Sequence, residues 1–205
     1  MLKFNEEKHE YTYSGVKKMS VTTIFNSVGV KNCDGKFISL SNFEYLQNLE
    51  ISGYFGKVFH EYARLYHLGK RFAYDDQLEP WAAGHRKFIE KNPEINTKNC
   101  ITSIVEMPMY CSMYDYCGTP DLVIEFPRKV IVLDWKTAVS YHKHYGWQIS
   151  AYCEMVKEIY KRKPIEGWCV NILKNDFRVK KIKGIELKKN FNDFKSILNT
   201  YRLAA

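Results

Sequence analysis

The stretch GTPDLVIEFPRKVIVLDWK, residues 118–136, contains two apolar segments separated by a short turn. Leu122–Phe126 and Val130–Leu133 are rich in β-branched and other apolar residues, which is the pattern of buried strands. Between them, Pro127–Lys129 has the composition of a turn. The stretch therefore predicts two strands paired as an antiparallel hairpin.

The register of this hairpin decides which polar groups meet at its open end. A turn centred on Pro127 and Arg128 places Asp121 directly opposite Asp134. Pro-Arg is a poor two-residue hairpin turn, so a slip of one or two residues is an open alternative. Lys136 shares the face of Asp134, because side chains on a strand repeat every two residues.

A second hairpin is expected just upstream. Residues 101–110 (ITSIVEMPMY) and 116–124 (YCGTPDLVI) form strand patterns joined by a turn at 112–115. Centring that hairpin on Met113 and Tyr114 places Glu106 opposite Asp121. Three neighbouring strands would then present three carboxylates in a row.

Such a row is electrostatically unfavourable on its own. At about 4 Å and an effective dielectric constant near 20, each carboxylate pair repels by roughly 4 kcal/mol. Lys136 can neutralise one of the three charges. The remainder suits a divalent cation that prefers oxygen ligands, Mg²⁺ or Mn²⁺. Ordinary surface salt bridges at strand ends are the alternative that these residues leave open.

The segment after Lys136 predicts a polar connection over 137–146 and then a helix from Trp147. In this helix a core-facing stripe recurs at helical spacing, formed by Ile149, Tyr152, Cys153, Val156, Ile159 and Tyr160. Gln148 lies one turn before Tyr152 on the same side. This amide and phenol could reach a phosphate held by the metal.

Three motifs in this order resemble those of the PD-(D/E)XK nuclease superfamily: GTPD at 118–121, DWK at 134–136 and QISAY at 148–152. Within it the chain is most similar to RecB-type exonucleases, including small phage-encoded members and mitochondrial genome-maintenance exonucleases. GKVFH at 56–60 matches the G-x-x-x-H pattern of that branch, and residues 9–25 resemble the opening of its phage proteins.

The resemblance implies a role for each matching residue. Asp121 and Asp134 would bind Mg²⁺ or Mn²⁺, with His60 and the Trp135 backbone carbonyl as further ligands. Lys136 would position or activate the attacking water and stabilise charge on the phosphate. Without the resemblance, His60 would be read as a half-buried, hydrogen-bonded histidine, and the Trp135 side chain as core.

Three further residues complete the catalytic set that the resemblance implies. Glu106 would be an auxiliary acid, and Gln148 and Tyr152 would orient the lysine, the water or the DNA strand. For Tyr152 a packing role with a locally bonded hydroxyl is the alternative. The expected products carry a 5′-phosphate and a 3′-hydroxyl.

Composition agrees with DNA as the partner. The formal charge is +8 and the sequence pI is about 9.0, which favours an anionic partner. Much of the basic excess falls late in the chain, where a solvated face is the alternative. The candidate DNA-contacting residues are Arg64, Lys161, Arg162, Lys163, Lys180 and Lys181.

We expect one domain over 1–205, an α/β restriction-endonuclease-like fold in which helices flank a central mixed sheet. Residues 1–50 would form an accessory segment and about 52–183 the catalytic core. Besides the elements above, the expected elements are a β-rich start at 2–16, helices over 20–29, 39–49 and 75–91, a helix containing His60, strands over 166–173 and 177–183, and a closing helix over 188–203.

Several missing patterns set further expectations. Without a secretory signal, transmembrane run or transit peptide, a cytoplasmic protein with no membrane partner is expected. The six cysteines lack C-x-x-C spacing and the C-terminal trio of cluster-binding relatives, so free core thiols and no iron–sulfur cluster are expected. No P-loop motif is present, so a helicase or recombination partner would be a separate protein.

Three functions remain open from the sequence. A DNA exonuclease acting on single-stranded or free ends, in repair or recombination, agrees best with the resemblance. A structure-specific or nicking endonuclease would use the same chemistry. A non-catalytic DNA-binding module is opposed by the intact set of Asp121, Asp134 and Lys136. Polarity, DNA against RNA, oligomeric state and pathway are not encoded in a recognisable way.

Overall fold

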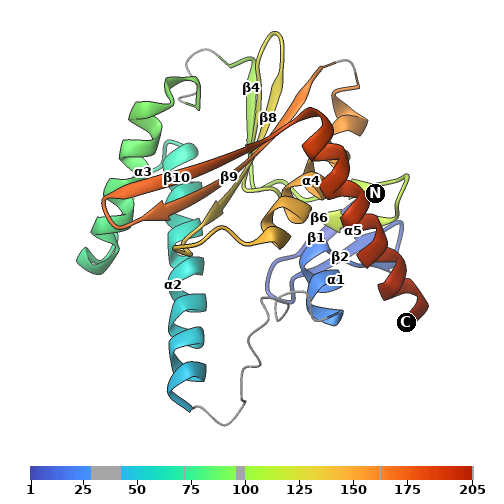
Figure 1. Ribbon diagram of the computed structural model, residues 1–205, viewed down its shortest axis with the longest axis horizontal. Helices are drawn as coiled ribbons and strands as arrows, with labels where there is room; N and C mark the ends of the chain where they lie inside the picture. Colours follow the sequence, from blue (N-terminus) through green and yellow to red (C-terminus); the bar gives the residue numbers. More distant parts are fainter. Residues whose placement is uncertain (29–42, 72, 96–99, 162, 205) are drawn as a thin grey trace.

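A five-stranded mixed sheet forms the centre of the protein in a computed structural model that describes residues 1–28, 43–71, 73–95, 100–161 and 163–204 (Figure 1). The strand order is β10-β9-β8-β7-β4. β8 and β9 run parallel, and the other neighbours are antiparallel. The strands are β4 (Thr102–Val105), β7 (Leu122–Glu125), β8 (Val130–Lys136), β9 (Ile165–Leu173) and β10 (Asp176–Ile182).

The predicted register of both hairpins is confirmed. Leu122 pairs with Leu133, so Asp121 and Asp134 follow as the next facing positions. Val105 pairs with Leu122, and the Glu106 N–H donates to the Asp121 carbonyl at 3.1 Å. No slip occurs at the Pro-Arg turn, because Phe126 N–H closes it on the carbonyl of Lys129 at 2.8 Å.

The prediction of continuous strands over 101–110 and 116–124 is wrong. The upstream hairpin is divided between two sheets, with β5 (Met109–Cys111) and β6 (Tyr116–Gly118) forming a separate two-stranded pair. Glu106 has φ +46° at the division, where Pro108 and Pro120 lack the N–H that a ladder needs. The break leaves Glu106 and Asp121 at a sheet edge.

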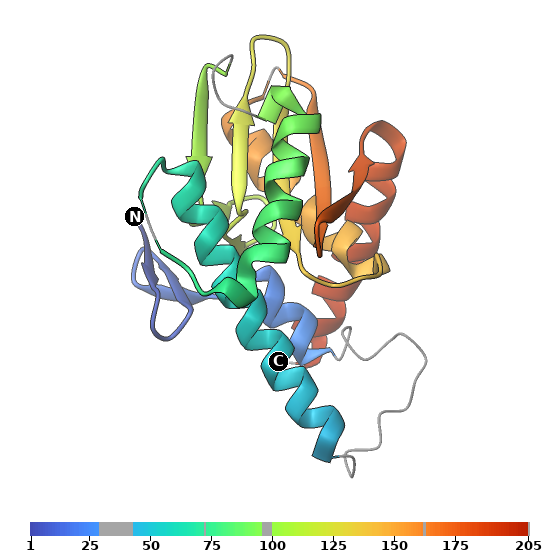
Figure 2. The ribbon, with the colours of Figure 1, turned by 90° about the vertical axis from the view of Figure 1, so that its left-hand side faces the viewer.

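Helices cover both faces of the central sheet (Figures 1 and 2). The helices are α2 (Phe43–His67), α3 (Glu79–Lys91), α4 (Lys143–Ile159) and α5 (Gly184–Ala204). Because side chains alternate between the two faces along β8, this strand contributes to two apolar cores. Val130 and Val132 pack with α4 and α5, while Ile131 and Leu133 pack with α2 and α3. The α/β architecture expected from the sequence is confirmed at this level.

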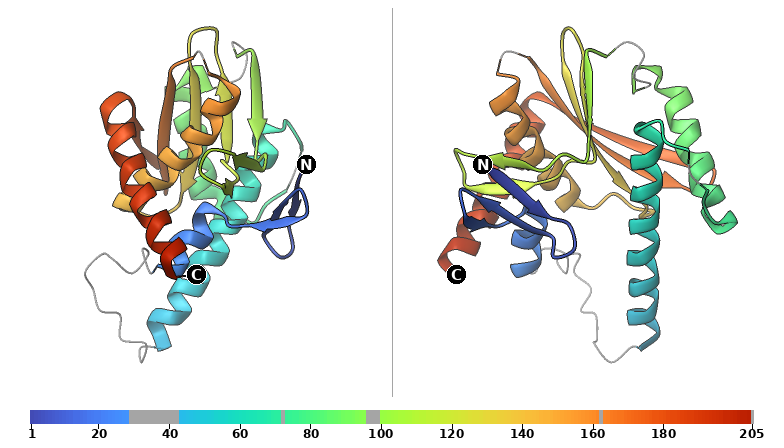
Figure 3. Two further views of the ribbon diagram at one scale, coloured as in Figure 1. Left: turned by 90° about the vertical axis from the view of Figure 1, so that its right-hand side faces the viewer. Right: turned by 180° about the vertical axis from the view of Figure 1, so that it is seen from behind.

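The N-terminal segment packs beside the small β5–β6 pair (Figure 3). It contains β1 (Leu2–Asn5), β2 (Glu10–Tyr13), β3 (Val16–Lys18) and α1 (Val21–Ser27). The Tyr13 and Tyr110 rings stack with centroids 4.2 Å apart, and the Tyr11 hydroxyl bonds Thr119 at 2.7 Å. Two short 3₁₀ turns, Asp76–Leu78 and Pro93–Ile95, flank α3.

Several predicted boundaries need correction. The expected helix over 39–49 and the helix containing His60 are one helix from residue 43, and residues 39–42 lie outside the described residues. Gly53 does not interrupt it, since one glycine costs a helix only about 1 kcal/mol. α4 begins at Lys143 rather than Trp147, and the closing helix begins at Gly184 rather than 188.

Among the described residues, no helix combines the length and apolarity needed to cross a membrane.

Gly84 provides a test of how closely α3 packs on the sheet. A Cβ there would lie 2.4 Å from the Leu173 carbonyl oxygen and 2.5 Å from that of Asp176, in the β9–β10 turn. Gly84→Ala should lower the free energy of unfolding by about 1–3 kcal/mol in urea titrations. Gly53→Ala is the matched control, because a Cβ at Gly53 meets nothing within 4 Å. Equal stability of the two variants would contradict this packing.

Candidate metal centre

Three potential metal ligands from different elements meet at the edge of the sheet. His60 comes from α2, Glu106 follows β4 and Asp121 precedes β7, and their ligand atoms all lie within 4.8 Å of one another. His60 Nδ1 is 3.1 Å from Asp121 Oδ1. Because the three ligands come from separate elements, only the tertiary fold brings them together.

Asp134 and Lys136 lie beside this group on β8. Lys136 Nζ is 2.5 Å from Asp134 Oδ2, and both side chains are largely buried. No described group donates a well-directed hydrogen bond to that oxygen. On the neighbouring strand, Asp121 Oδ2 accepts the Trp135 N–H at 2.7 Å. Asp134 is therefore an ion-paired carboxylate with spare acceptor capacity.

Burial and charge set the protonation of these groups. Burial raises the pKa of Asp134, with Lys136 opposing it. For Asp121, burial is outweighed by His60, Lys136 and the Trp135 N–H, so its pKa falls below the usual range. The pKa values of His60 and Lys136 are raised, because the neighbouring carboxylates outweigh the effect of their burial. Lys136 is thus a cation at neutral pH.

Glu106 is the carboxylate that these cations stabilise least. Burial, followed by repulsion from Asp121, raises its pKa to about 7. Arg64 is 3.7 Å away and offsets part of this cost. A divalent cation between His60, Glu106 and Asp121 would offset the repulsion. The two carboxylates are oxygen ligands of the kind that Mg²⁺ and Mn²⁺ prefer, while the imidazole also suits other divalent metals. The three side chains can therefore hold a divalent cation, and its identity as Mg²⁺ or Mn²⁺ stays a prediction.

Gln148 and Tyr152 form a buried pair on α4. Gln148 Nε2 donates to the Tyr152 hydroxyl at 2.9 Å, which fulfils the local bonding that the packing alternative required. Burial and the charge of Asp134 raise the Tyr152 pKa well above its normal value. The phenol remains protonated, and its own hydrogen is left to donate toward the acidic site.

The Trp135 side chain belongs to the apolar core beneath α2 and α3. Its side chain is 2% exposed and stacks on His67, with ring centroids 5.6 Å apart. Phe88 packs edge-on against its other side at 5.4 Å. The prediction that this side chain lies in the core is confirmed. The role of the Trp135 carbonyl as a ligand stays a prediction.

Among the predicted DNA-contacting residues, Arg64 adjoins the centre. Its guanidinium donates to both Glu61 carboxylate oxygens at 2.7 Å and lies near Glu106. Arg64 therefore stands at the rim of the acidic group, where its unpaired N–H groups could contact a phosphate.

The other predicted contacts are spread over the surface. Lys163 binds Glu125 at 2.5 Å beside the first residue of β8, whereas the centre lies at the last residues of that strand. Lys180 pairs with Glu186 at 2.8 Å, and Lys181 lies 3.6 Å from the centroid of the Trp168 ring. Lys161 is exposed near Lys163, and Arg162 lies outside the described residues. The structure does not bring these lysines to the candidate centre.

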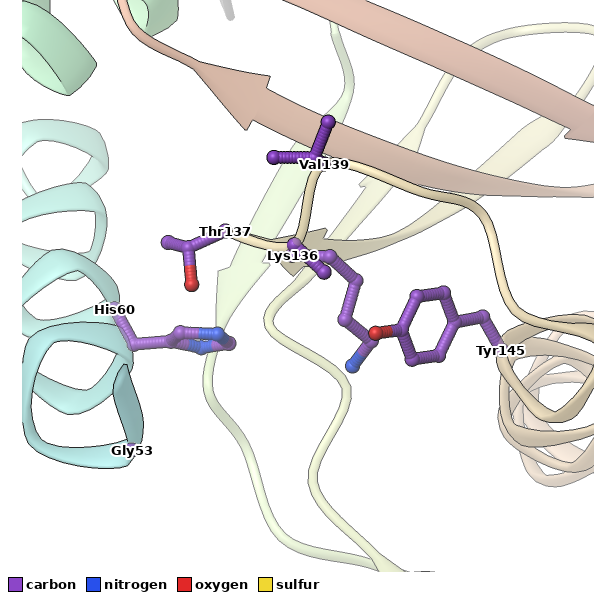
Figure 4. Close-up of a pocket in the computed structure, with 7 residues that line it drawn as sticks. Gly53, His60, Lys136, Thr137, Val139 and Tyr145 are labelled. Atoms are coloured by element: carbon purple, nitrogen blue, oxygen red, sulfur yellow. The ribbon is translucent and has the colours of Figure 1, made fainter. Parts of the chain in front are cut away.

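Other residues at the centre were not singled out from the sequence. Thr137 and Tyr145 line a pocket together with His60 and Lys136 (Figure 4). The Lys136 ammonium lies 5.1 Å from the centroid of the Tyr145 ring, within range of a cation–π interaction. The signal for Tyr145 would have been an earlier start of α4, which places it one turn before Gln148.

Comparison with known proteins adds little. No family model matches the chain, and no curated protein matches it. A solved structure titled "Crystal structure of SSO0001" is similar over 90% of this chain and 77% of that chain, at 15% sequence identity and a TM-score of 0.44. A likeness of this size supports no inference about function, which therefore depends on the site itself.

Glu106 gives the metal-free protein a pH-dependent stability. Its folded pKa of about 7 exceeds the ordinary 4.5, so the folded state holds a proton more tightly and stability falls as pH rises between these values. Glu106→Gln removes this cost. The free energy of unfolding of the variant minus that of wild type, measured in EDTA, should be about 1–3 kcal/mol higher at pH 8 than at pH 5.

The control for this comparison is Glu61→Gln. The hydrogen bond from Arg64 lowers the Glu61 pKa, so replacing Glu61 by glutamine should not raise the free energy of unfolding at pH 8. A Glu106→Gln variant with the same pH dependence as wild type would contradict the assigned charge state.

Metal binding should be visible as stabilisation. Mn²⁺ at a hundred times its dissociation constant should stabilise the wild-type protein by about 2–3 kcal/mol, seen as a higher midpoint of thermal unfolding. Asp121→Asn and His60→Gln should lose most of this shift, while Glu61→Gln keeps it. The same Mn²⁺ shift in Asp121→Asn would place the ion elsewhere.

Proposed function

We propose that this protein is a Mg²⁺- or Mn²⁺-dependent DNA nuclease with a restriction-endonuclease-like fold, acting as an exonuclease on free or single-stranded ends. The observation that carries the proposal is the pairing of Asp134 with Lys136 at 2.5 Å, next to the ligand group of His60, Glu106 and Asp121. A buried cation adjoining a metal-binding group is the combination needed to hold a reacting phosphodiester.

Each residue of the candidate metal centre would have its own role in phosphodiester hydrolysis. A divalent cation bound by His60, Glu106 and Asp121 would supply Lewis-acid polarisation of the phosphate and a more acidic water. Lys136 stays protonated and donates to a phosphate oxygen as negative charge grows on it. Asp134, predicted from the sequence as a metal ligand, lies outside the group of His60, Glu106 and Asp121; since burial raises its pKa, it would instead accept a proton from the attacking water.

Groups around the reacting atoms would keep them in place. The Tyr152 hydroxyl, fixed by Gln148, has a hydrogen to donate toward the acidic site. Arg64 at the rim is available to the neighbouring phosphate. Attack by water on phosphorus leaves a 5′-phosphate and a 3′-hydroxyl when the bond to the 3′-oxygen breaks.

DNA is the proposed partner because the chain carries a net charge of +8. The phosphates of either strand would find basic groups on several elements, and binding should weaken steeply with salt. We place the protein in the cytoplasm, with any helicase or recombination motor supplied by a separate protein.

A nuclease assay tests the proposal. Pure protein is incubated with end-labelled single strands, linear duplex and closed circular DNA, with Mg²⁺, Mn²⁺ or EDTA. We expect metal-dependent degradation of the linear substrates. The rate should fall about 10²–10³-fold in Lys136→Ala, because removing one preorganised hydrogen-bond donor from a water-excluded site has an effect of this size. Lys87→Ala, which breaks an exposed ion pair between α3 and Asp176 at the start of β10, should retain activity.

Each other outcome has a defined meaning. Cutting of the closed circle would replace the exonuclease by an endonuclease of the same chemistry. Products with 3′-phosphates would contradict the proposed mechanism. Salt-sensitive DNA binding without cleavage of any substrate would leave a binding module instead of an enzyme.

A further inference from the structure

A cavity of about 490 Å³ lies beside the candidate centre, between α2 and the segment that follows β8. Figure 4 shows His60 on one side and Tyr145 on the other, with Lys136 between them. Its lining residues are Gly53, His60, Lys136, Thr137, Ala138, Val139 and Tyr145. Because two of them belong to the centre, any phosphate held there has its attached nucleoside at or near this cavity.

Gly53 lies in the α2 wall of the cavity, and Gly56 follows it one turn later in the same helix. Of the described parts of the chain, no heavy atom lies within 4 Å of a Cβ placed at Gly53. One turn later, a Cβ at Gly56 would lie 3.6 Å from Thr137 Oγ1, so the helix and the opposite segment nearly touch there. The cavity therefore lies on the Gly53 side of this close approach between α2 and Thr137.

The opposite wall is held in place by side chains from β9 and β10. Asn171 Nδ2 donates to the Ala138 carbonyl at 2.8 Å and to the Ser140 carbonyl at 3.3 Å. Arg178 donates to the Val139 carbonyl at 3.2 Å. Asn171 is 3% exposed and pairs in register with Lys136. This wall is thus preformed and anchored to the same strands as the centre.

Tyr145 closes the cavity on the α4 side. Its ring faces the Lys136 ammonium, which has Asp134 on its other side. The cavity is therefore lined by the hydrogen-bond donors of His60 and Lys136 next to the centre. The rest of its lining includes the Tyr145 ring, Val139 and the helix backbone at Gly53. This mixture suits a group that is anionic at one end and largely flat and apolar at the other.

We propose that this cavity is the subsite for one nucleoside unit of the DNA strand, with its 5′-phosphate at the centre beside His60 and Lys136. The proposal rests on the proposed function and adds the place where the substrate is recognised. A cavity of this size falls in the range that encloses one small ligand. Gly53 is the residue that keeps it accessible.

Binding of thymidine 5′-monophosphate tests the subsite without any turnover, because this molecule contains no phosphodiester bond. Its affinity is measured by calorimetry in Mn²⁺ for wild type, Gly53→Leu and the control Tyr54→Leu, whose parent side chain is 72% exposed and outside the cavity. We expect Gly53→Leu to weaken binding at least tenfold, with Mn²⁺ and inorganic phosphate bound as in wild type. Tyr54→Leu should bind all three normally.

Two results would overturn the subsite. The first is an equal affinity of wild type and Gly53→Leu for thymidine 5′-monophosphate. The second is a wild-type protein that binds thymidine 5′-monophosphate no more tightly than inorganic phosphate. If Gly53→Leu fails to fold, Val139→Phe fills the cavity from the opposite wall, where the native side chain is 68% exposed. The same tenfold loss is expected for it, and its normal binding would count against the subsite.

Failure of the subsite and of the proposed function are distinguishable. A wild-type protein that degrades DNA, but whose Gly53→Leu variant degrades and binds equally well, would retain the nuclease and lose the subsite. A protein that binds the nucleotide in a Gly53-dependent manner but cleaves no DNA would retain the subsite and lose the nuclease.

Discussion

Two carboxylates held face to face on adjacent strands are the constraint around which this protein is organised. The β7–β8 register brings Asp121 and Asp134 to facing positions, and both are buried. Like charges in that arrangement oppose folding. Lys136, on the same strand as Asp134, and His60, on α2, lie beside these carboxylates and offset part of this cost. Glu106 adds a third acid with incomplete compensation, which leaves the site suited to a divalent cation.

The alternation of β8 connects this site to the rest of the molecule. Asp134 and Lys136 point to one face of the sheet, and Trp135 between them points into the core beneath α2 and α3. The helix that supplies His60 therefore packs on the same strand segment that supplies the lysine. Gln148 and Tyr152 belong to α4, which covers the face of the sheet opposite to α2 and α3. The reacting groups are thus fixed by both layers of helices.

Much of this arrangement could be predicted from the sequence, because it depends on local pattern. The apolar runs set the strands, and counting back from each turn gave the facing of Glu106, Asp121 and Asp134. The break at Glu106 was missed, although Pro108 and Pro120 beside it are visible in the sequence; the positive φ of Glu106 itself is not indicated by the apolar pattern. The placement of Lys163 at the far end of β8 also follows from topology, because β9 must begin beside Val130 to run parallel to β8.

The central claim is that His60, Glu106 and Asp121 hold one divalent cation next to the Asp134–Lys136 pair. Anomalous diffraction from crystals grown with Mn²⁺ tests it most directly. The account predicts a single strong anomalous peak among these three side chains, with ligand distances of about 2.1–2.3 Å. A peak elsewhere, or none at this position with the Asp121 and Glu106 carboxylates still in contact with His60 and Arg64, would contradict it.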